Sequence, residues 1–396
     1  MLFEVKIVVH QCQLTEQDSP YATFRTLLYY HAFSYFQSMK LHLVNGFLGS
    51  GKTTTIAAAC VQLKEAGFRV AVITNDQGQD LVDTYYLRSL GITTNEVTGG
   101  CFCCHFSQLE SSLLQFISNY DPEVIFAESV GSCTDLIATV AKPLLQKYPH
   151  LELTISTVTD ASLLFKIIQG QAAFLTEEIR YIFQKQIEEA DILFLNKADQ
   201  LITSELALLT IQAGSFYPDK QVMTGSALNP VDIGIWLNYL PGLSGATSRQ
   251  VLEVDYDRYA AGEASLGWLN VRFPIPDTQG RSLLIAEKVI ITFHQKIIDQ
   301  KLIIGHLKCL IKTGGETYKF NFTSSSVEKP PDTSIHLFAS DSELTINARV
   351  ACPPRQLKNL LLETLKLIEH EFTILLEAGP IHAFAPEYPN PQFRMD

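Results

Sequence analysis

A glycine-rich segment from Gly46 to Thr53 carries residue types and a spacing that suit phosphate binding. It follows the apolar run Leu-His-Leu-Val-Asn and precedes a helical pattern, as a phosphate-binding loop requires. Glycines let the backbone wrap an anion, Lys52 reaches the β- and γ-phosphates, and Thr53 binds Mg²⁺. A loop that only turns the chain requires neither the lysine nor the threonine. The residues expected to bind nucleotide here are Gly46, Gly49, Ser50, Gly51, Lys52, Thr53 and Thr54.

A second predicted strand ends in the pattern Asn-Lys-x-Asp, from Asn196 to Asp199. Asp199 accepts hydrogen bonds from the ring N–H and amino groups of guanine, whereas adenine offers no matching donors and leaves the carboxylate unpaired. The pattern therefore favours GTP over ATP, with Asn196, Lys197 and Asp199 as guanine contacts. The later segment Thr-Gly-Ser-Ala fits a further guanine-contacting loop through Ser226 and Ala227.

A third predicted strand, Val-Ile-Phe-Ala, ends in Glu128, and Gly131 follows three residues later. Glu128 is expected to bind Mg²⁺ through water, to orient the attacking water or to contact a metal cargo, and Gly131 to sense the γ-phosphate through its backbone N–H. A solvated carboxylate without such a role is the alternative. Lys52 and Glu128 are the expected catalytic residues.

Three cysteines, Cys101, Cys103 and Cys104, fall within four positions after a Gly-Gly pair. On an extended strand Cys104 points away from the other two, so ligation by all three requires a turn, which the glycines permit. Three thiolates leave a tetrahedral Zn²⁺ one ligand short, which favours a site that exchanges metal, and His105 is a weaker candidate for the fourth ligand. A redox pair or inert buried thiols are the alternatives. The other cysteines are isolated and are expected to fill cores: Cys12, Cys60, Cys133, Cys309 and Cys352.

These segments must be positioned by an alternation of short β runs and helical stretches that begins near Lys40. Apolar runs such as Arg-Val-Ala-Val-Ile-Thr are separated by predicted helices over 53–66, 107–118 and 177–189. Strands joined by such helices form right-handed crossovers in a mostly parallel sheet covered on both faces. The sequence therefore predicts an α/β fold whose ligands lie at the carboxyl ends of the strands.

Composition shifts predict the domain organisation. A P-loop GTPase domain is expected at 39–242, a linker at 243–265, and a second, smaller α+β domain at 266–375, where a long helix lies between predicted strands. The proline-rich tail at 376–396 predicts an extended arm. The aromatic-rich segment 1–38 is either a start upstream of the native one or an added strand and helix.

Composition also excludes several classes of protein. The chain has 396 residues, of which 46% are hydrophobic, and a formal net charge of -12, with no Lys/Arg-rich run. An acidic surface repels phosphate backbones, so no nucleic-acid partner is expected. No apolar stretch approaches bilayer length and no secretory leader pattern is found, so we expect no membrane contact and a cytoplasmic location.

Together the motifs resemble the CobW family of P-loop GTPases, whose relatives include the hydrogenase and urease nickel-insertion GTPases. The resemblance covers roughly residues 39–242. It rests on the phosphate loop at 46–53, Gly-Cys-x-Cys-Cys at 100–104, Glu-x-x-Gly at 128–131 and the guanine motif at 196–199. It implies an enzyme that hydrolyses GTP to GDP and phosphate and delivers zinc or another transition metal to a client protein, or supports cobalamin synthesis.

Two departures from the family pattern affect the expected site. After the second strand the family usually has Asn-Glu, where this chain has Asn75-Asp76, so the resemblance implies a shorter metal-binding carboxylate at Asp76. After Glu128 the family usually has Thr or Ser just before the glycine and a proline soon after it. This chain instead reads Ser-Val-Gly-Ser-Cys-Thr-Asp, which leaves the role of Asp135 open.

The expected mechanism couples the two sites. GTP held with Mg²⁺ orders the loops that carry the metal ligands, and hydrolysis changes the thiolate geometry so that metal passes to the client. The expected ligands of Mg²⁺ or of the transition metal are Thr53, Asp76, Glu128, Cys101, Cys103 and Cys104. A GTP-dependent metal sensor or scaffold with incidental hydrolysis, or an accessory GTPase for nickel insertion or cobalamin synthesis, is the alternative. A homodimer also stays open.

Overall fold

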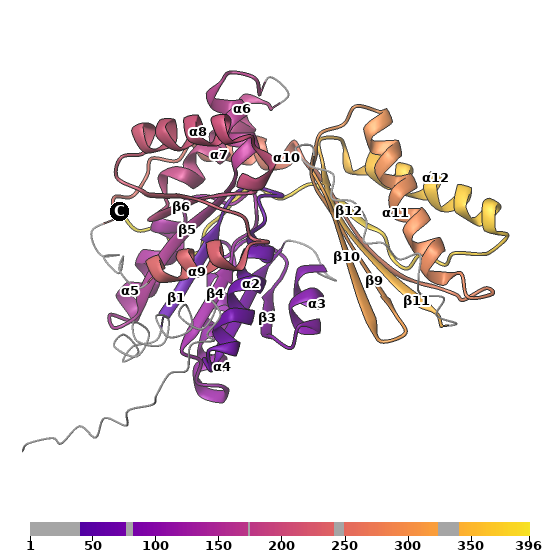
Figure 1. The fold of residues 1–396 in the computed structure, drawn as a ribbon, viewed down its shortest axis with the longest axis horizontal. Helices are drawn as coiled ribbons and strands as arrows, with labels where there is room; N and C mark the ends of the chain where they lie inside the picture. The colour runs from indigo at the N-terminus through magenta and orange to yellow at the C-terminus, as the bar shows by residue number, and fades with distance from the viewer. Residues whose placement is uncertain (1–39, 77–81, 173–174, 241–248, 324–339) are drawn as a thin grey trace, which may run out of the picture. The chain divides into compact units, whose positions relative to one another are not determined.

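Seven strands form a parallel sheet in the order β3-β2-β4-β1-β5-β6-β7 (Figure 1). The five inner strands are short runs of almost entirely buried residues, as expected for strands covered on both faces, whereas the edge strands β3 and β7 are only partly buried. The computed structural model describes residues 40–76, 82–172, 175–240, 249–323 and 340–396, so the predicted extension at 1–38 lies outside the described residues. The strands are β1 (Lys40–Asn45), β2 (Val70–Asn75), β3 (Thr93–Val97), β4 (Val124–Glu128), β5 (Glu152–Asp160), β6 (Ile192–Asn196) and β7 (Gln221–Thr224).

Helices cover both faces of this sheet. On one face, Phe106 and Leu113 of α4 pack with Ile125 of β4 in a single buried cluster. On the other face, Trp236 of α9 stacks between Phe126 and Phe194. The helices are α2 (Lys52–Glu65), α3 (Val82–Ser89), α4 (Phe106–Asn119), α5 (Lys142–Lys147), α6 (Ala161–Ile168), α7 (Glu177–Glu188), α8 (Thr203–Phe216) and α9 (Pro230–Tyr239), with a π-helix η1 (Ile137–Ala141) and a 3-10 helix η2 (Ala198–Gln200).

A second sheet has five antiparallel strands in the order β10-β9-β11-β8-β12. One face packs against α11 (Ser282–Asp299) and α12 (Pro354–Phe372) in a separate apolar core. The strands are β8 (Gly267–Ile275), β9 (Ile304–Thr313), β10 (Glu316–Phe322), β11 (Ser342–Val350) and β12 (His382–Phe384). The predicted α/β fold with a smaller α+β domain is therefore confirmed, and residues 38–396 form one compact unit.

Two segments expected to be irregular contain regular structure. Within the expected linker 243–265, Asp255 caps a helix, α10 (Tyr256–Ala264), whose Tyr259 is fully buried. Within the expected proline-rich arm, β12 pairs with β8. Pairing is possible there because residues 381–385 contain no proline and so keep their N–H donors.

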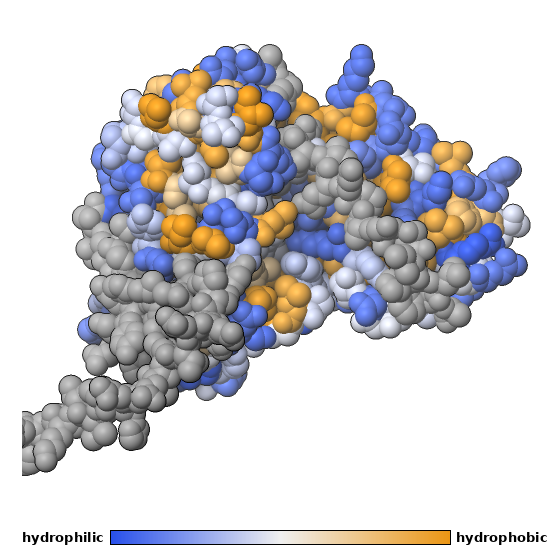
Figure 2. All heavy atoms as spheres, in the orientation of Figure 1, coloured by the Kyte–Doolittle hydropathy of each residue, from blue (hydrophilic) through white to orange (hydrophobic). Residues whose placement is uncertain are grey.

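Apolar side chains reach the surface along α8 and α9, where Figure 2 shows them among polar residues. Ile211 of α8 and Leu228, just before α9, are both more than two-thirds exposed. None of the described helices combines the length and apolarity that crossing a bilayer requires.

Candidate functional site

The phosphate loop is held open by three glycines with positive φ, at Gly46, Gly49 and Gly51. A side chain at Gly51 would place its Cβ 2.3 Å from the amide nitrogen of Asn196, so only glycine fits there. Lys52 is buried, and its Nζ donates to the Gly46 carbonyl at 2.7 Å. Burial lowers the pKa of Lys52 to about 8, although the nearby charge of Glu128 acts to raise it. The loop thus holds a desolvated cation beside a carboxylate.

The residues expected to bind Mg²⁺ lie together. Thr53 Oγ1 donates to Glu128 Oε1 at 2.9 Å, which joins the start of α2 to the end of β4. Among the described residues, the buried Glu128 Oε2 has no hydrogen-bond partner. Burial and then the nearby Asp83 raise the pKa of Glu128. A hydroxyl next to an unsatisfied carboxylate oxygen is a donor set that fits Mg²⁺.

The guanine motif is fixed to the phosphate loop by Asn196. Its amide donates to the Ser50 carbonyl and its oxygen accepts from the Ala227 N–H, both at 2.7 Å. Lys197, in a left-handed conformation, pairs with Asp160 at 3.0 Å. Asp199 is exposed and lines the same pocket as Lys52, Thr53 and Glu128.

Gly131 lies against the phosphate loop. A Cβ at this position would come within 2.7 Å of a Leu48 methyl group and 3.0 Å of Lys52 Nζ. The absence of a side chain at Gly131 permits this approach, which brings the backbone after β4 next to Lys52. Most of the predicted nucleotide contacts line one pocket: Gly49, Gly51, Lys52, Thr53, Thr54, Glu128, Asn196, Lys197, Asp199, Ser226 and Ala227.

Asp76 lies elsewhere than expected. It does not line the nucleotide pocket, and its Oδ1 pairs with Arg349 Nη2 at 2.5 Å. Arg349 is fully buried and stacks over Trp268 at 3.4 Å. The sequence could not reveal this pairing, because Arg349 lies 273 residues away in the second sheet.

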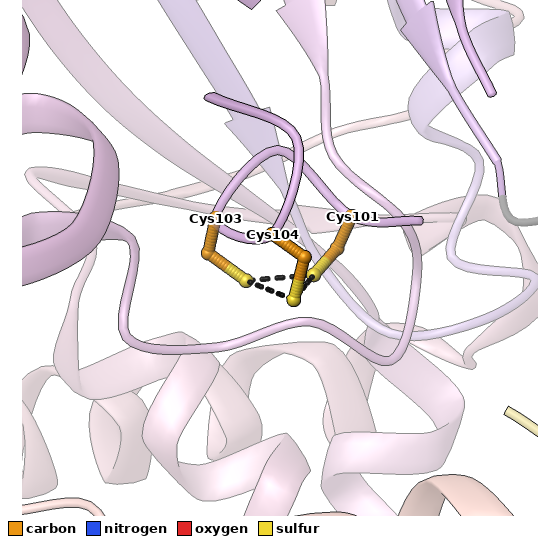
Figure 3. Close-up of side chains that lie close together, drawn as sticks. All are labelled: Cys101, Cys103 and Cys104. Carbon is orange, nitrogen blue, oxygen red and sulfur yellow. Dashed lines mark hydrogen bonds between the residues drawn. The ribbon is translucent and has the colours of Figure 1, made fainter. Parts of the chain in front are cut away.

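The three cysteines of the loop after β3 point toward one another (Figure 3). Their Sγ atoms are 2.6 Å apart for Cys101 and Cys103, 3.4 Å for Cys101 and Cys104, and 3.7 Å for Cys103 and Cys104. The predicted turn is present at 102–105. Zn–S bonds of about 2.3 Å place tetrahedral sulfurs roughly 3.8 Å apart. The Cys103 to Cys104 edge matches that value, whereas Cys101 and Cys103 must separate by roughly 1 Å to bind zinc.

Unequal hydrogen bonding distinguishes the thiols. Hydrogen bonding with Cys103 and then with Cys104 lowers the pKa of Cys101 well below its ordinary value. Hydrogen bonding with Cys101 raises the pKa of Cys103 well above its ordinary value and that of Cys104 to about 11. Cys101 is therefore the thiol that ionises first. Thiolates are the form that binds metal.

The surroundings of the cysteine loop include groups that the sequence did not single out. Cys133, predicted only as a core residue, lies in one buried cluster with Cys101, Cys103, Val130 and Trp268. The sequence feature that could have pointed to Cys133 is its position five residues after Glu128, a residue already expected in the site.

The C-terminal tail also reaches the loop. The Asn390 N–H donates to Cys104 Sγ at 3.3 Å, and the Gln392 N–H to the Cys103 carbonyl at 2.9 Å. His105 and Glu263 line the hollow beside Cys101 and Cys104. The ligand atoms of Cys101, Cys103 and Cys104 all lie within 4.8 Å of one another, and no other described His, Cys, Asp or Glu joins this group.

Comparison with known proteins finds similarity over the first domain. A model described as the CobW/HypB/UreG nucleotide-binding domain matches residues 40–224. The zinc chaperone YjiA of Escherichia coli is 30% identical over 162 residues, or 40% of this chain and 48% of YjiA. The zinc chaperone CobW of Pseudomonas aeruginosa is 25% identical over 244 residues, or 54% of this chain and 61% of that protein. The chain thus spans about half the length of YjiA and less than two-thirds of CobW.

A crystal structure of HypB from Helicobacter pylori in complex with nickel is 15% identical, with a TM-score of 0.39, and the match covers 60% of this chain and all of that chain. The match to the family model spans the phosphate loop, the cysteine loop and the guanine motif. Residues 40–224 of this chain therefore resemble the CobW/HypB/UreG nucleotide-binding domain.

Proposed function

We propose that the chain is a GTP-hydrolysing metallochaperone, which binds a transition metal at Cys101, Cys103 and Cys104 and releases it to a client protein. The observation that carries this proposal is a single short segment that touches both sites. It begins at Glu128 in the nucleotide pocket, passes Gly131 against Lys52, and reaches Cys133 in the cluster around Cys101. A backbone shift at the phosphate end therefore displaces a residue that packs on the thiols.

A second connection runs through Asn75 at the end of β2. Its amide donates to the Gly100 carbonyl at 2.7 Å, and its oxygen accepts from the Phe102 N–H at 2.9 Å. Asn75 thereby holds the backbone on both sides of Cys101. Asp76 is the next residue in the chain, so a movement of the segment after β2 would also displace the cysteine loop through Asn75.

The proposed chemistry is attack of water on the γ-phosphate of GTP. Lys52 and the N–H groups of the phosphate loop stabilise the charge that develops on the phosphate oxygens, and Glu128 orients the water. Thr53 and Glu128 would hold Mg²⁺, which when bound neutralises charge on the β- and γ-phosphates. Asp199 and Asn196 select guanine.

The cargo is most consistent with zinc, because soft thiolates suit it and the relatives YjiA and CobW are named as zinc chaperones. Three thiolates without a fourth ligand among the described side chains favour transfer over permanent storage. The client is a metal-requiring protein, and we place the reaction in the cytoplasm.

The test is a single-turnover experiment with zinc-loaded protein and GTP. Phosphate release and zinc transfer to a chromophoric chelator are followed together. We expect zinc to leave with the rate constant of phosphate release, and a non-hydrolysable GTP analogue to retain the metal. Equal zinc transfer with GTP and with the analogue would instead indicate a sensor or scaffold in which hydrolysis is incidental.

A further inference from the structure

The second sheet has one apolar and one polar face, and both are largely buried. Along β9, Leu307, Cys309 and Ile311 point to the core formed with α11 and α12. The alternate residues, including Lys308, point the other way. Register pairing puts Asn321 of β10 and Asn347 of β11 beside Lys308 on that polar face. A buried polar face requires partners from another part of the molecule.

Those partners lie at the start of α3 in the nucleotide-binding domain. Asp83 forms ion pairs with both Lys308 and Lys319, the latter at 3.3 Å. The Val82 N–H donates to Asn347 Oδ1 at 2.8 Å. Lys319 also lies 4.1 Å from the centre of the Tyr86 ring. The polar face of the second sheet thus contacts the start of α3, the helix that follows β2.

The two lysines also line the nucleotide pocket, together with Lys52, Thr53 and Glu128. The second sheet approaches the phosphate loop closely there. A Cβ on Gly49 would lie 2.3 Å from a Thr323 methyl group and 2.8 Å from the Gly305 carbonyl oxygen. The pocket wall opposite the phosphate loop is therefore built by β9 and β10.

Charges in this wall suit an anion. Lys52 is buried, and Lys308 and Lys319 are partly buried, with side chains 17% and 10% exposed. The carboxylates that act on them are Asp83, Glu128 and, for Lys308, also Asp76, which is itself paired with Arg349. Burial lowers the pKa of Lys308, but Asp83 and then Glu128 outweigh it, so the net shift is upward and the side chain stays charged. Taking a cation out of water is costly unless a partner compensates it. Apart from the Asp76–Arg349 pair, three lysines face two carboxylates, which leaves one positive charge for an anion to balance.

We propose that Lys308 and Lys319 bind the terminal phosphate oxygens of a nucleoside triphosphate, so that the second domain supplies part of the phosphate site. This inference rests on the proposed GTP-binding function. The phosphate competes with Asp83 for the two ammonium groups. GTP binding therefore loosens the hold of the second sheet on α3, and loss of the γ-phosphate restores it.

The test compares Lys308→Met, which removes the charge but keeps most of the stem, with Lys312→Met. Lys312 is the matched control, because it lies on the same face of β9 over the Tyr85 ring but does not line the pocket. Affinities for a fluorescent non-hydrolysable GTP analogue and for fluorescent GDP are measured on the full chain. We expect Lys308→Met to weaken the triphosphate about 10- to 100-fold and GDP less than about threefold. Lys312→Met should change neither.

The Asp83→Asn variant should change triphosphate affinity in the opposite direction to Lys308→Met. Removing the competing carboxylate charge should tighten triphosphate binding by about three- to tenfold, measured in protein whose thermal unfolding remains cooperative. Equal losses for GDP and triphosphate in Lys308→Met, or no loss at all, would overturn the proposal, as would unchanged triphosphate affinity in Asp83→Asn. If the wild-type chain binds no guanine nucleotide, the proposed function itself fails, which is a separate result.

Discussion

The nucleotide pocket and the cysteine loop differ in how completely their groups are fixed. In the pocket, Asn196 bridges two backbone segments, and Thr53 already meets Glu128. In the cysteine loop, three thiols face one another, and the group of ligand atoms within 4.8 Å among the described residues holds only these three. The donors of the first site are already paired, whereas the second offers three ligands to an ion that takes four. A metal carrier benefits from this difference, because a rigid site with a full ligand shell does not give up its metal.

The two sites nevertheless share structure. Glu128, Gly131 and Cys133 lie on one segment, and Asn75 fixes the cysteine loop from the end of β2. The comparison therefore predicts that damage to the pocket stops hydrolysis outright, whereas damage to the loop changes metal binding and leaves nucleotide binding in place.

The largest expected effect comes from Lys52→Ala. Lys52 is a buried cation of the phosphate loop, so its removal should lower kcat for GTP hydrolysis about 100- to 1,000-fold. Phosphate release under saturating GTP measures this effect. Lys64→Ala, at an exposed position near the end of the same helix, is the control and should retain activity. Wild-type turnover in Lys52→Ala would disprove the phosphate-loop assignment.

The next effect is on the metal. Cys103→Ser removes one of three thiolates and should weaken zinc binding about 100-fold, while GTP affinity stays within about threefold. Competition with a chromophoric zinc chelator gives the affinity. Cys352→Ser removes a cysteine of the second core and should bind zinc like the wild type. If Cys103→Ser retains full zinc affinity, this thiol is not a ligand.

A smaller effect is expected at the base. Asp199→Asn should reduce discrimination between GTP and ATP about tenfold, because an amide cannot accept both guanine hydrogen bonds. Competition of the two nucleotides against a fluorescent guanine nucleotide measures the ratio. Xanthosine triphosphate sharpens the test, since its carbonyl in place of the amino group accepts from the new amide. An unchanged GTP-to-ATP ratio would count against Asp199 as the guanine contact.

The parts of the site that the sequence could predict are those with local patterns. The phosphate loop, the guanine motif and the cysteine turn each lie within a few consecutive residues, between elements whose periodicity is clear. Their backbone geometry follows from glycines and strand ends. The parallel sheet and the smaller second domain were predictable for the same reason.

Contacts between distant segments could not be predicted. Asp76 was expected at a metal, but a buried arginine 273 residues away pairs with it. Lys308 and Lys319 occupy ordinary strand positions, and nothing local distinguishes them from lysines at a solvated face. The proline-rich tail was expected to form an extended arm, and nothing in its sequence indicated that the N–H groups of Asn390 and Gln392 contact Cys104 and Cys103.

The most direct test of coupling between the two sites is zinc affinity in defined nucleotide states. Zn²⁺ is titrated into nucleotide-free, GDP-bound and GTP-analogue-bound protein under reducing conditions. We expect about a tenfold or greater difference between the GDP and GTP-analogue states, and reciprocity requires zinc to change the ratio of the two nucleotide affinities by the same factor. Identical zinc affinities in all three states would contradict nucleotide-controlled metal delivery.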